Sequence, residues 1–251
     1  MNAGAGLSLL VPFREDASGT RTAPFEWLCA YYRAHLPAAE MVVGECTGHP
    51  YSKSIAVNDA AAKATGEVFV IVDADIWLSP LVIERCAAAI RRNRTGLWFL
   101  PHHASYELVR EDTEAVLACD PAKYDSFGVP TRYDQRVDKA PGQALIISSE
   151  AFFTVGGFDP RFRGWGGEDT AFVRAADTLY AKHRRTRDWI VSLWHERPDW
   201  RSKKDRHWGD GVRYGDNDAT HTLVKRYKSA NGNVAEMRAL VDEWLKGDQP
   251  V

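Results

Sequence analysis

The feature that most constrains this chain is a series of short apolar runs separated by segments with a helical pattern. Val68–Val72 (VFVIV) is apolar at every position, and Leu7–Val11 (LSLLV) and Met41–Gly44 (MVVG) are nearly so. Such runs predict strands covered on both faces, as in a largely parallel sheet flanked by helices. The segments between and after them predict helices at Phe25–Leu36, Ser52–Thr65 and Pro80–Arg92. We therefore predict an α/β fold.

The second half of the chain is less regular. Further strands are expected at Gly96–Leu100, Ala144–Ser148 and Trp189–Trp194, and further helices at Glu168–His183 and Val234–Lys246. The polar segment Glu196–Asp218 contains one Pro and three Gly residues and predicts a loop. A length of 251 residues suits one α/β domain, and no linker interrupts it. We expect a single domain over 1–251, with a nucleotide-binding half at about 1–103, an acceptor and catalytic half at about 104–215, and a helical segment at about 216–251.

Composition excludes several classes of protein. Hydrophobic residues make up 45% of the chain and charged residues 26%, which predicts a globular fold rather than disorder. The net charge of −2 gives no basic field for a nucleic acid. The basic clusters Lys182–Arg187 and Arg201–Arg206 fit solvated surface, with an anion site as the alternative.

The chain shows no sign of export or membrane insertion. Its cysteines are far apart and lack CxxC spacing, which argues against a zinc site or a disulfide framework and favours reduced, mostly buried thiols. No apolar stretch approaches the roughly 18 residues of a membrane span. We expect a cytoplasmic protein with no membrane span and no nucleic-acid partner.

Two acids follow the most apolar strand directly, in the sequence Asp73-Ala74-Asp75. With a period of two, both carboxylates would point to one face of the sheet. Like charges so close repel unless a cation or hydrogen-bond donors compensate, and a divalent metal does so while also binding a nucleotide diphosphate. The alternative is that both acids begin a surface loop and cap the next helix. Ligands gather at the carboxyl ends of parallel strands, which favours the metal.

Two segments carry a resemblance to a known family. VFVIVDADIWLSP resembles the D-x-D segment of the GT-A glycosyltransferases. GGFDPRFRGWGGEDTAF at Gly156–Phe172 resembles the G-W-G-G-E-D block of the β-1,4-galactosyltransferases and the W-G-G-E block of the polypeptide N-acetylgalactosaminyltransferases. Bacterial chondroitin-polymerase-type enzymes carry a similar signature. The resemblance runs from about Leu7 to His195, in the family's order.

The resemblance implies a GT-A (Rossmann-like), mostly parallel sheet flanked by helices and a metal-dependent glycosyltransferase activity. The donor would be a nucleotide sugar, with uridine diphosphate as the expected nucleotide, and the acceptor a hydroxyl of a glycan, a protein or a lipid-linked sugar. Residues implied in donor binding are Pro12, Phe13, Arg14, Tyr51, Lys53, Asp73, Gly142 and Trp165. In this set Tyr51 would stack on the base, Lys53 would neutralise phosphate charge, and Trp165 would form a wall of the sugar site. Asn58 also matches a family position, where helix packing is an equally good interpretation.

The same resemblance implies a site for Mn²⁺ or Mg²⁺. Asp75 would coordinate the metal, Asp73 would contact the ribose or a metal-bound water, and His195 in IVSLWHERP would be the third ligand. Carboxylate oxygens and a neutral imidazole suit manganese. The chain departs from the galactosyltransferases at Ser192, where they have methionine, which predicts a metal site that is more open, more weakly bound or less selective. Other histidines compete for the ligand role: His102, His103, His207 and His221.

Asp169 is the candidate catalytic base, with Glu168 beside it to hold an acceptor or donor hydroxyl. Asp169 would stand at a helix N-terminus, which favours its carboxylate form. The alternative is that both acids only complement the helix dipole. The N-acetylgalactosaminyltransferases retain anomeric configuration and carry asparagine at the position of Asp169, so the acid here favours inversion. The loop Glu196–Asp218 is expected to order over the bound donor.

Three other functions are weighed against this one. A retaining transferase of the same fold remains open. A non-catalytic carbohydrate- or nucleotide-binding module would not need Asp73, Asp75, Asp169 and His195 together. A sugar-phosphate nucleotidyltransferase should have a Gly-rich phosphate loop after the first strand, whereas PFREDASGTRTAP lacks closely spaced glycines.

Overall fold

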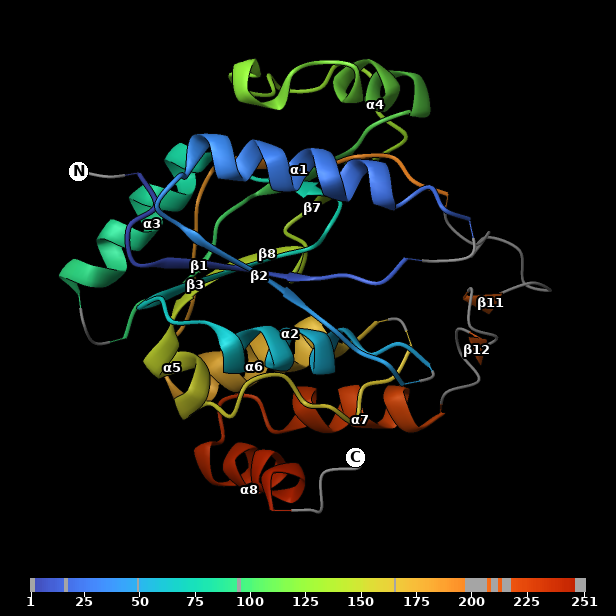
Figure 1. Cartoon of the computed structure of the whole chain (residues 1–251). Coiled ribbons are helices and arrows are strands. Elements are labelled where there is room, and N and C mark those ends of the chain that lie inside the picture. Colours follow the sequence, from blue (N-terminus) through green and yellow to red (C-terminus); the bar gives the residue numbers. More distant parts are fainter. Residues whose placement is uncertain are drawn as a thin grey trace.

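A central six-stranded sheet organises the chain in the computed structural model (Figure 1), which describes residues 3–15, 18–48, 50–93, 96–164, 166–196, 207–208, 212–213 and 218–246. The strand order is β2-β1-β3-β8-β5-β9. The strands are β1 (Leu7–Pro12), β2 (Glu40–Gly44), β3 (Val68–Val72), β5 (Phe99–Leu100), β8 (Ala144–Ser148) and β9 (Arg184–Arg185). Within this sheet β8 runs antiparallel to both of its neighbours, while β1 pairs in parallel with β2 and β3, and β5 with β9. The predicted mostly parallel sheet is confirmed.

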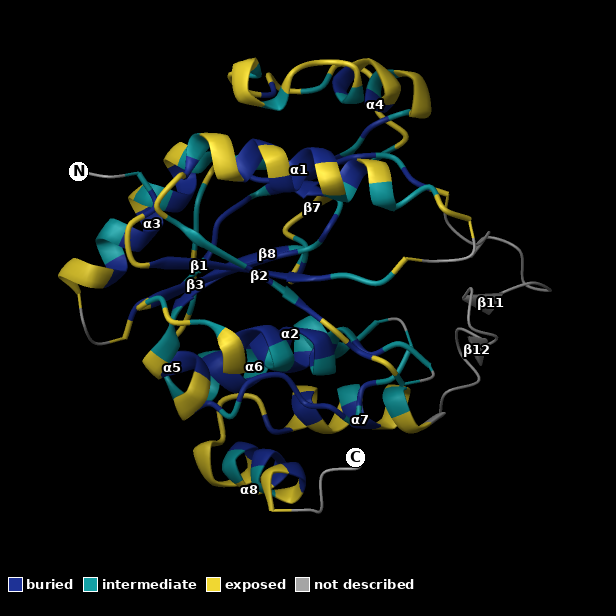
Figure 2. Cartoon of the chain, viewed as in Figure 1, coloured by how far each residue is buried: buried dark blue, intermediate teal, exposed yellow. Residues whose placement is uncertain are grey.

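Helices cover both faces of this sheet, as predicted. On one face lie α1 (Thr22–His35) and α3 (Pro80–Arg92), and on the other lie α2 (Lys53–Lys63), α5 (Ser149–Thr154) and α6 (Glu168–Leu179) (Figure 1). A hydrophobic core lies on each face of the sheet, and each strand contributes side chains to both cores because successive side chains alternate between the faces. In β3, Val68, Val70 and Val72 join the core of the first face, whereas Phe69 and Ile71 join that of the second. The dark, buried surfaces in Figure 2 accordingly face the sheet.

Two further layers lie outside these helices. The helix α4 (Arg110–Leu117) lies beyond α1, followed by the short 3-10 helix η1 (Pro121–Lys123). On the opposite side, α7 (Asp218–Ser229) and α8 (Val234–Leu245) pack under α6 (Figure 1). Their apolar side chains form a third core with Phe162 and with Ala171 and Ala175 of α6.

A smaller sheet brings two distant parts of the chain to the carboxyl end of β3. Its order is β4-β10-β6-β7, formed by β4 (Ile76–Trp77), β6 (Ala104–Glu107), β7 (Gln135–Asp138) and β10 (Trp189–Ser192). The strand β4 follows the Asp73–Asp75 turn, and β10 runs antiparallel to it with Ser192 opposite Ile76. This pairing carries the segment after β10, with His195, back to the acidic turn.

The sequence-based boundaries need several corrections. In the expected strand Gly96–Leu100 only Phe99–Leu100 is a strand, and the expected helix Glu168–His183 ends at Leu179. Of the predicted loop Glu196–Asp218, most residues lie outside the described part of the chain. The exceptions inside it are Glu196, the start of α7 at Asp218, and two short paired strands, β11 (His207–Trp208) and β12 (Val212–Arg213).

The cysteines agree with the sequence analysis in most respects. Cys29, Cys46 and Cys86 are buried free thiols, and Cys119 is free but exposed. No helix in the described part of the chain combines the length and the apolar character needed to cross a bilayer.

Candidate active site

The two acids after β3 face different partners. The strand ends at Val72, so the period of two does not extend through Asp73 and Asp75. The Asp73 amide donates to the Gln143 carbonyl at 2.9 Å, which fixes the turn to the start of β8. The Asp73 carboxylate lies 2.6 Å from Lys53 Nζ. Asp75 instead accepts a hydrogen bond from Ser192 Oγ at 2.6 Å.

Asp75 and His195 are the candidate pair for a divalent cation. His195 Nε2 lies 3.7 Å from Asp75 Oδ2, and His195 Nδ1 lies 3.0 Å from the carbonyl oxygen of Glu196. A carbonyl only accepts, so Nδ1 carries a proton, and Nε2 is the ring nitrogen that faces the Asp75 carboxylate. In the neutral form of the ring, Nε2 and the carboxylate could hold a metal ion between them. Within the described residues no set of three His, Cys, Asp or Glu side chains converges, because Asp73 turns toward Lys53.

Lys53 joins the acidic turn to the candidate base. It is the first residue of α2, and its Nζ lies 2.6 Å from Asp73 Oδ1 and 2.9 and 3.0 Å from the two oxygens of Asp169. Burial alone would lower the pKa of Lys53, but the carboxylates of Asp169 and Asp73 outweigh it and hold this pKa well above its ordinary value. The ammonium therefore stays charged between the two acids.

Asp169 and Glu168 stand at the N-terminus of α6, as predicted. The residue before them, Gly167, caps the helix with φ +96° and offers no side-chain hydrogen bond. Burial, reinforced by the negative charge of Asp169, raises the pKa of Glu168 to about 7. Burial also raises the pKa of Asp73 to about 6, although Lys53 opposes the shift. Among the described residues, the neighbouring acids Asp73, Glu168 and Asp169 thus outnumber the cation that lies between them, Lys53.

Gly142 lies against the carboxylate of Asp169. A β-carbon at this position would stand 1.9 Å from Asp169 Oδ2, so only glycine allows this approach. The sequence resemblance implied a glycine near the donor sugar. The structure shows that Gly142 contacts the candidate base.

The residues expected to line the nucleotide pocket lie at the ends of β1 and α2. Phe13 stacks on Phe25 with ring centroids 4.0 Å apart. The guanidinium of Arg14 lies 4.8 Å from the ring centroid of Tyr51 and donates to the Gly48 carbonyl at 3.0 Å. Pro12 ends β1 and is buried. Trp165 lies outside the described residues.

Two residues at the site escaped the sequence analysis. Ser52 is fully buried, caps α2 by accepting from the Ile55 amide at 3.2 Å, and donates to the Phe162 carbonyl at 2.7 Å. A serine at a helix start was a usable signal for the cap. Gln143 holds Asp73 through its carbonyl and has φ +73°, which no sequence pattern announces.

The competing histidines His102 and His221 lie in surroundings that differ from those of His195. His102 is fully buried with both ring nitrogens lacking a hydrogen-bond partner among the described residues, and burial lowers its pKa to about 3. His221 is exposed on α7. The side chain of His207 is outside the described part. The family resemblance favoured His195 as the third metal ligand, and its position beside Asp75 is consistent with that choice.

Two family sequence models match the chain. The model described as glycosyl transferase family 2 matches residues 48–148, and the model described as N-terminal domain of galactosyltransferase matches residues 124–185. The first range includes Lys53, Asp73, Asp75 and Gly142, and the second includes Asp169. No curated protein sequence matches the chain.

Several solved structures are similar in fold. The catalytic domain of Drosophila β1,4-galactosyltransferase 7 with xylobiose is 16% identical over 86% of this chain and 79% of that chain, with a TM-score of 0.47. The Pyrobaculum calidifontis mannosyltransferase PcManGT with GDP-Man and Mn²⁺ is 15% identical over 97% of this chain and 76% of that one, with a TM-score of 0.47. S. aureus TarS is 12% identical over 95% of this chain and 42% of that one, with a TM-score of 0.48.

The α/β fold with its helix-flanked sheet, together with the matched sequence segments, defines a glycosyltransferase of the GT-A type. Within that class, the matching models are those of glycosyl transferase family 2 and of the galactosyltransferases.

Proposed function

We propose that this glycosyltransferase moves a sugar from a uridine diphosphate donor to an acceptor hydroxyl with inversion, using Asp169 as the base. One observation carries the proposal: Lys53 Nζ contacts both Asp73 and Asp169, so the acid of the turn and the acid of α6 share one site. A structural role in capping α6 alone would not require Asp169 to reach across to α2. In this proposal Asp73 belongs to the donor side and Asp169 is the base.

In this proposal the charged residues of the site have separate roles. Arg14 and Lys53 attract the diphosphate, and the charge on Lys53 persists because its carboxylate neighbours raise its pKa. Asp169 takes the proton from the acceptor hydroxyl while the oxygen attacks the anomeric carbon and the bond to the diphosphate breaks. Glu168 orients a hydroxyl of either sugar. The donor lies against residues of about 1–103 and the acceptor against residues of about 104–215.

Asp75 and His195 would hold the divalent cation, manganese or magnesium, with Asp73 close by. Bound there, it would stabilise the negative charge that develops on the departing diphosphate. Ser192 Oγ already donates to Asp75 Oδ2, which supports a weaker and more exchangeable cation site than one built with an uninvolved side chain at that position. We also propose that the segment Glu196–Asp218 covers the bound donor; reduced protease cleavage there with donor and manganese tests this.

Activity with a panel of nucleotide sugars, with and without manganese, tests the function. Asp75→Ala should abolish metal-dependent release of the nucleotide diphosphate. Asp169→Asn should keep donor affinity within about threefold while lowering transfer by at least about 10³-fold, as expected when a general base is lost. The exposed Asp138→Asn is the matched control and should retain wild-type rates.

Two outcomes would contradict the proposal. Wild-type transfer by Asp169→Asn would remove the base assignment. Donor binding without turnover, for every donor and acceptor tried, would favour a binding module. The anomeric configuration of the product, followed by NMR, separates inversion from retention.

A further inference from the structure

The loop over residues 156–164 and 166–167 lies along the α7–α8 pair. A β-carbon on Gly156, at its start, would stand 2.8 Å from Val241 Cγ1 of α8. A β-carbon on Gly167, at its end, would stand 2.3 Å from Val224 Cγ2 of α7. Gly167 directly precedes Glu168 and Asp169. Thus α7 lies against Gly167, the N-cap residue of α6, which is the helix that carries Glu168 and Asp169.

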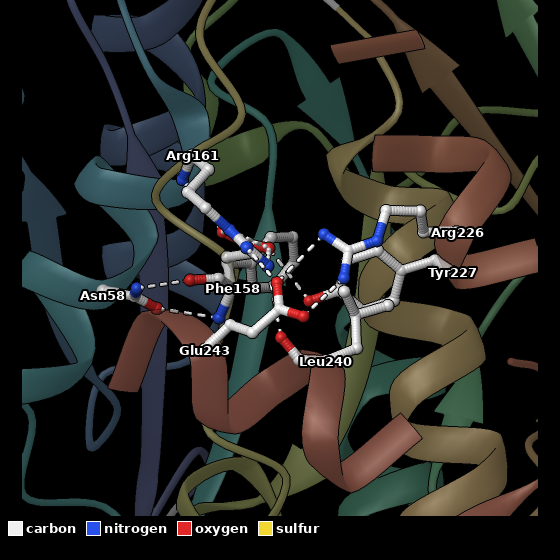
Figure 3. A network of polar contacts seen from close by, with 8 residues as sticks. Asn58, Phe158, Arg161, Arg226, Tyr227, Leu240 and Glu243 are labelled. Carbon is white, nitrogen blue, oxygen red and sulfur yellow. Dashed lines mark hydrogen bonds and ion pairs between the residues drawn. The ribbon is translucent and has the colours of Figure 1, made fainter. Parts of the chain in front are cut away.

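Between these ends, a polar network that includes the buried Asp159 and Tyr227 binds the loop to both helices. Asp159 is 5% exposed, accepts from the Arg161 amide at 2.9 Å and from Arg161 Nη2 at 2.7 Å, and accepts from the Tyr227 hydroxyl at 3.0 Å. Arg161 reaches on to α8, donating to the Leu240 carbonyl at 3.2 Å and to Glu243 at 2.8 Å (Figure 3). Glu243 also binds Arg226 of α7 at 2.9 Å.

The opposite edge of the same loop is bound to α2. The side-chain amide of Asn58 donates to the Phe158 carbonyl at 2.7 Å and accepts from the Phe158 amide at 2.9 Å (Figure 3). Ser52 donates to the Phe162 carbonyl at 2.7 Å, and the Gly164 amide donates to the Tyr51 carbonyl at 2.7 Å. The loop therefore lies between the α7–α8 pair and the helix that carries Lys53.

The burial of Asp159 indicates a role for the network. Burying a carboxylate costs desolvation free energy unless its oxygens are paired, and a loop that only connects two elements at the surface does not require a buried carboxylate. None of Asp159, Arg161 and Tyr227 contacts Lys53, Asp73 or Asp169 among the described interactions, so these residues do not take part in the chemistry directly. What they fix is the backbone that leads into Asp169.

We propose that Asp159, Arg161 and Tyr227 are positioning residues for Asp169. In this proposal the α7–α8 pair holds in place the loop that leads into Asp169. This inference rests on the proposed role of Asp169 as the base. Loss of the Tyr227–Asp159 hydrogen bond leaves the loop free to shift, and a displacement of about 1 Å at a reacting group costs up to about 10²-fold in rate.

Tyr227→Phe tests the inference with the smallest change, since it removes one hydroxyl and keeps the buried ring. We expect kcat for transfer to fall about 10-fold while the KM for the donor stays within about twofold. Amide hydrogen exchange at residues 157–164 should accelerate. Tyr180→Phe is the matched control, because it removes a hydroxyl that accepts from the Gly96 amide at the far end of α6. It should leave kcat and exchange in the loop unchanged.

The outcomes separate this inference from the proposed function. Wild-type kcat and unchanged exchange in Tyr227→Phe would overturn the inference, as would an equal loss in both variants. Arg161→Lys gives a second reading, because lysine cannot reproduce the forked contacts to Asp159 and should lower kcat in the same way. If the wild-type chain transfers no sugar, yet exchange in the loop accelerates in Tyr227→Phe, the proposed function fails while the anchoring of the loop stands.

Discussion

The missing side chain at Gly142 determines how closely Asp169 can approach β8. The space that a β-carbon would need is filled by the carboxylate, 1.9 Å from Oδ2 and 2.4 Å from Cγ. This contact also explains how an acid so near Lys53 is kept in one orientation. A single methyl group at position 142 would push Asp169 away from both β8 and Lys53.

Gly142→Ala should therefore lower transfer by at least about 10²-fold, because the base is displaced, while the circular dichroism spectrum stays that of the native fold. Gly128→Ala is the control, since nothing lies within 4 Å of its would-be β-carbon. Steady-state kinetics of the two variants side by side check the prediction. Equal activity in both would show that Asp169 is free to move without cost.

The helix α2 depends on Ser52 in two ways, and the second is specific to the site. Ser52 accepts from the Ile55 amide as an N-cap and donates to the buried Phe162 carbonyl. Ser148 caps α5 in the same manner, through the Ala151 amide, without a second hydrogen bond among those described.

Ser52→Ala should lower the free energy of unfolding by about 2 kcal/mol and Ser148→Ala by about 1 kcal/mol, since the first also leaves a buried carbonyl unpaired. Urea denaturation of both variants measures the difference. An equal loss would mean that water replaces Ser52 at the Phe162 carbonyl.

The elements best predicted from sequence were those with strong apolar patterns. The strands β1, β2, β3 and β8 and the helices α1, α2, α3 and α8 lie within a few residues of their expected bounds. The small sheet was largely missed because β6 and β7 are short and pair only through tertiary contacts. The antiparallel direction of β8 could not be predicted from the sequence, because an apolar run such as ALIIS packs equally well in either direction.

The candidate site was predicted unevenly for the same physical reason. Motifs specified Asp73, Asp75, Lys53, Asp169 and His195. The structure places Lys53 between Asp73 and Asp169, and His195 beside Asp75. The contact between Lys53 and Asp169 joins residues far apart in sequence, which local patterns do not report. The positive φ of Gln143 is likewise set by tertiary contacts rather than by its residue type.

Over the whole molecule, the surplus of acid at the site makes stability depend on pH. Glu168 has an ordinary pKa of 4.5, which applies to the unfolded chain, and about 7 in the fold. Between these values the folded state binds more protons than the unfolded state, so the free energy of unfolding falls as pH rises through this window. Above pH 7 the full cost of the buried charge remains.

Glu168→Gln should therefore stabilise the metal-free protein at pH 8 and have little effect near pH 4.5. Thermal unfolding in the presence of a chelator, at a series of pH values, measures this. Glu150→Gln, an exposed acid on α5, is the control and should show no such trend. A stabilisation by Glu168→Gln that is the same at every pH would contradict the assigned shift.

The chain between β6 and β7 leaves the small sheet and returns to the same point. Glu107 is paired with Gln135, and the Asp134 amide donates to the Glu107 carbonyl at 2.8 Å. Residues 108–134, with α4 and η1, are thus an excursion with adjoining ends, and lengthening such an excursion costs little chain entropy. An insertion here would therefore leave the spacing of Asp73, Asp75 and Asp169 unchanged, and an engineer seeking to graft a new recognition segment would begin at this junction.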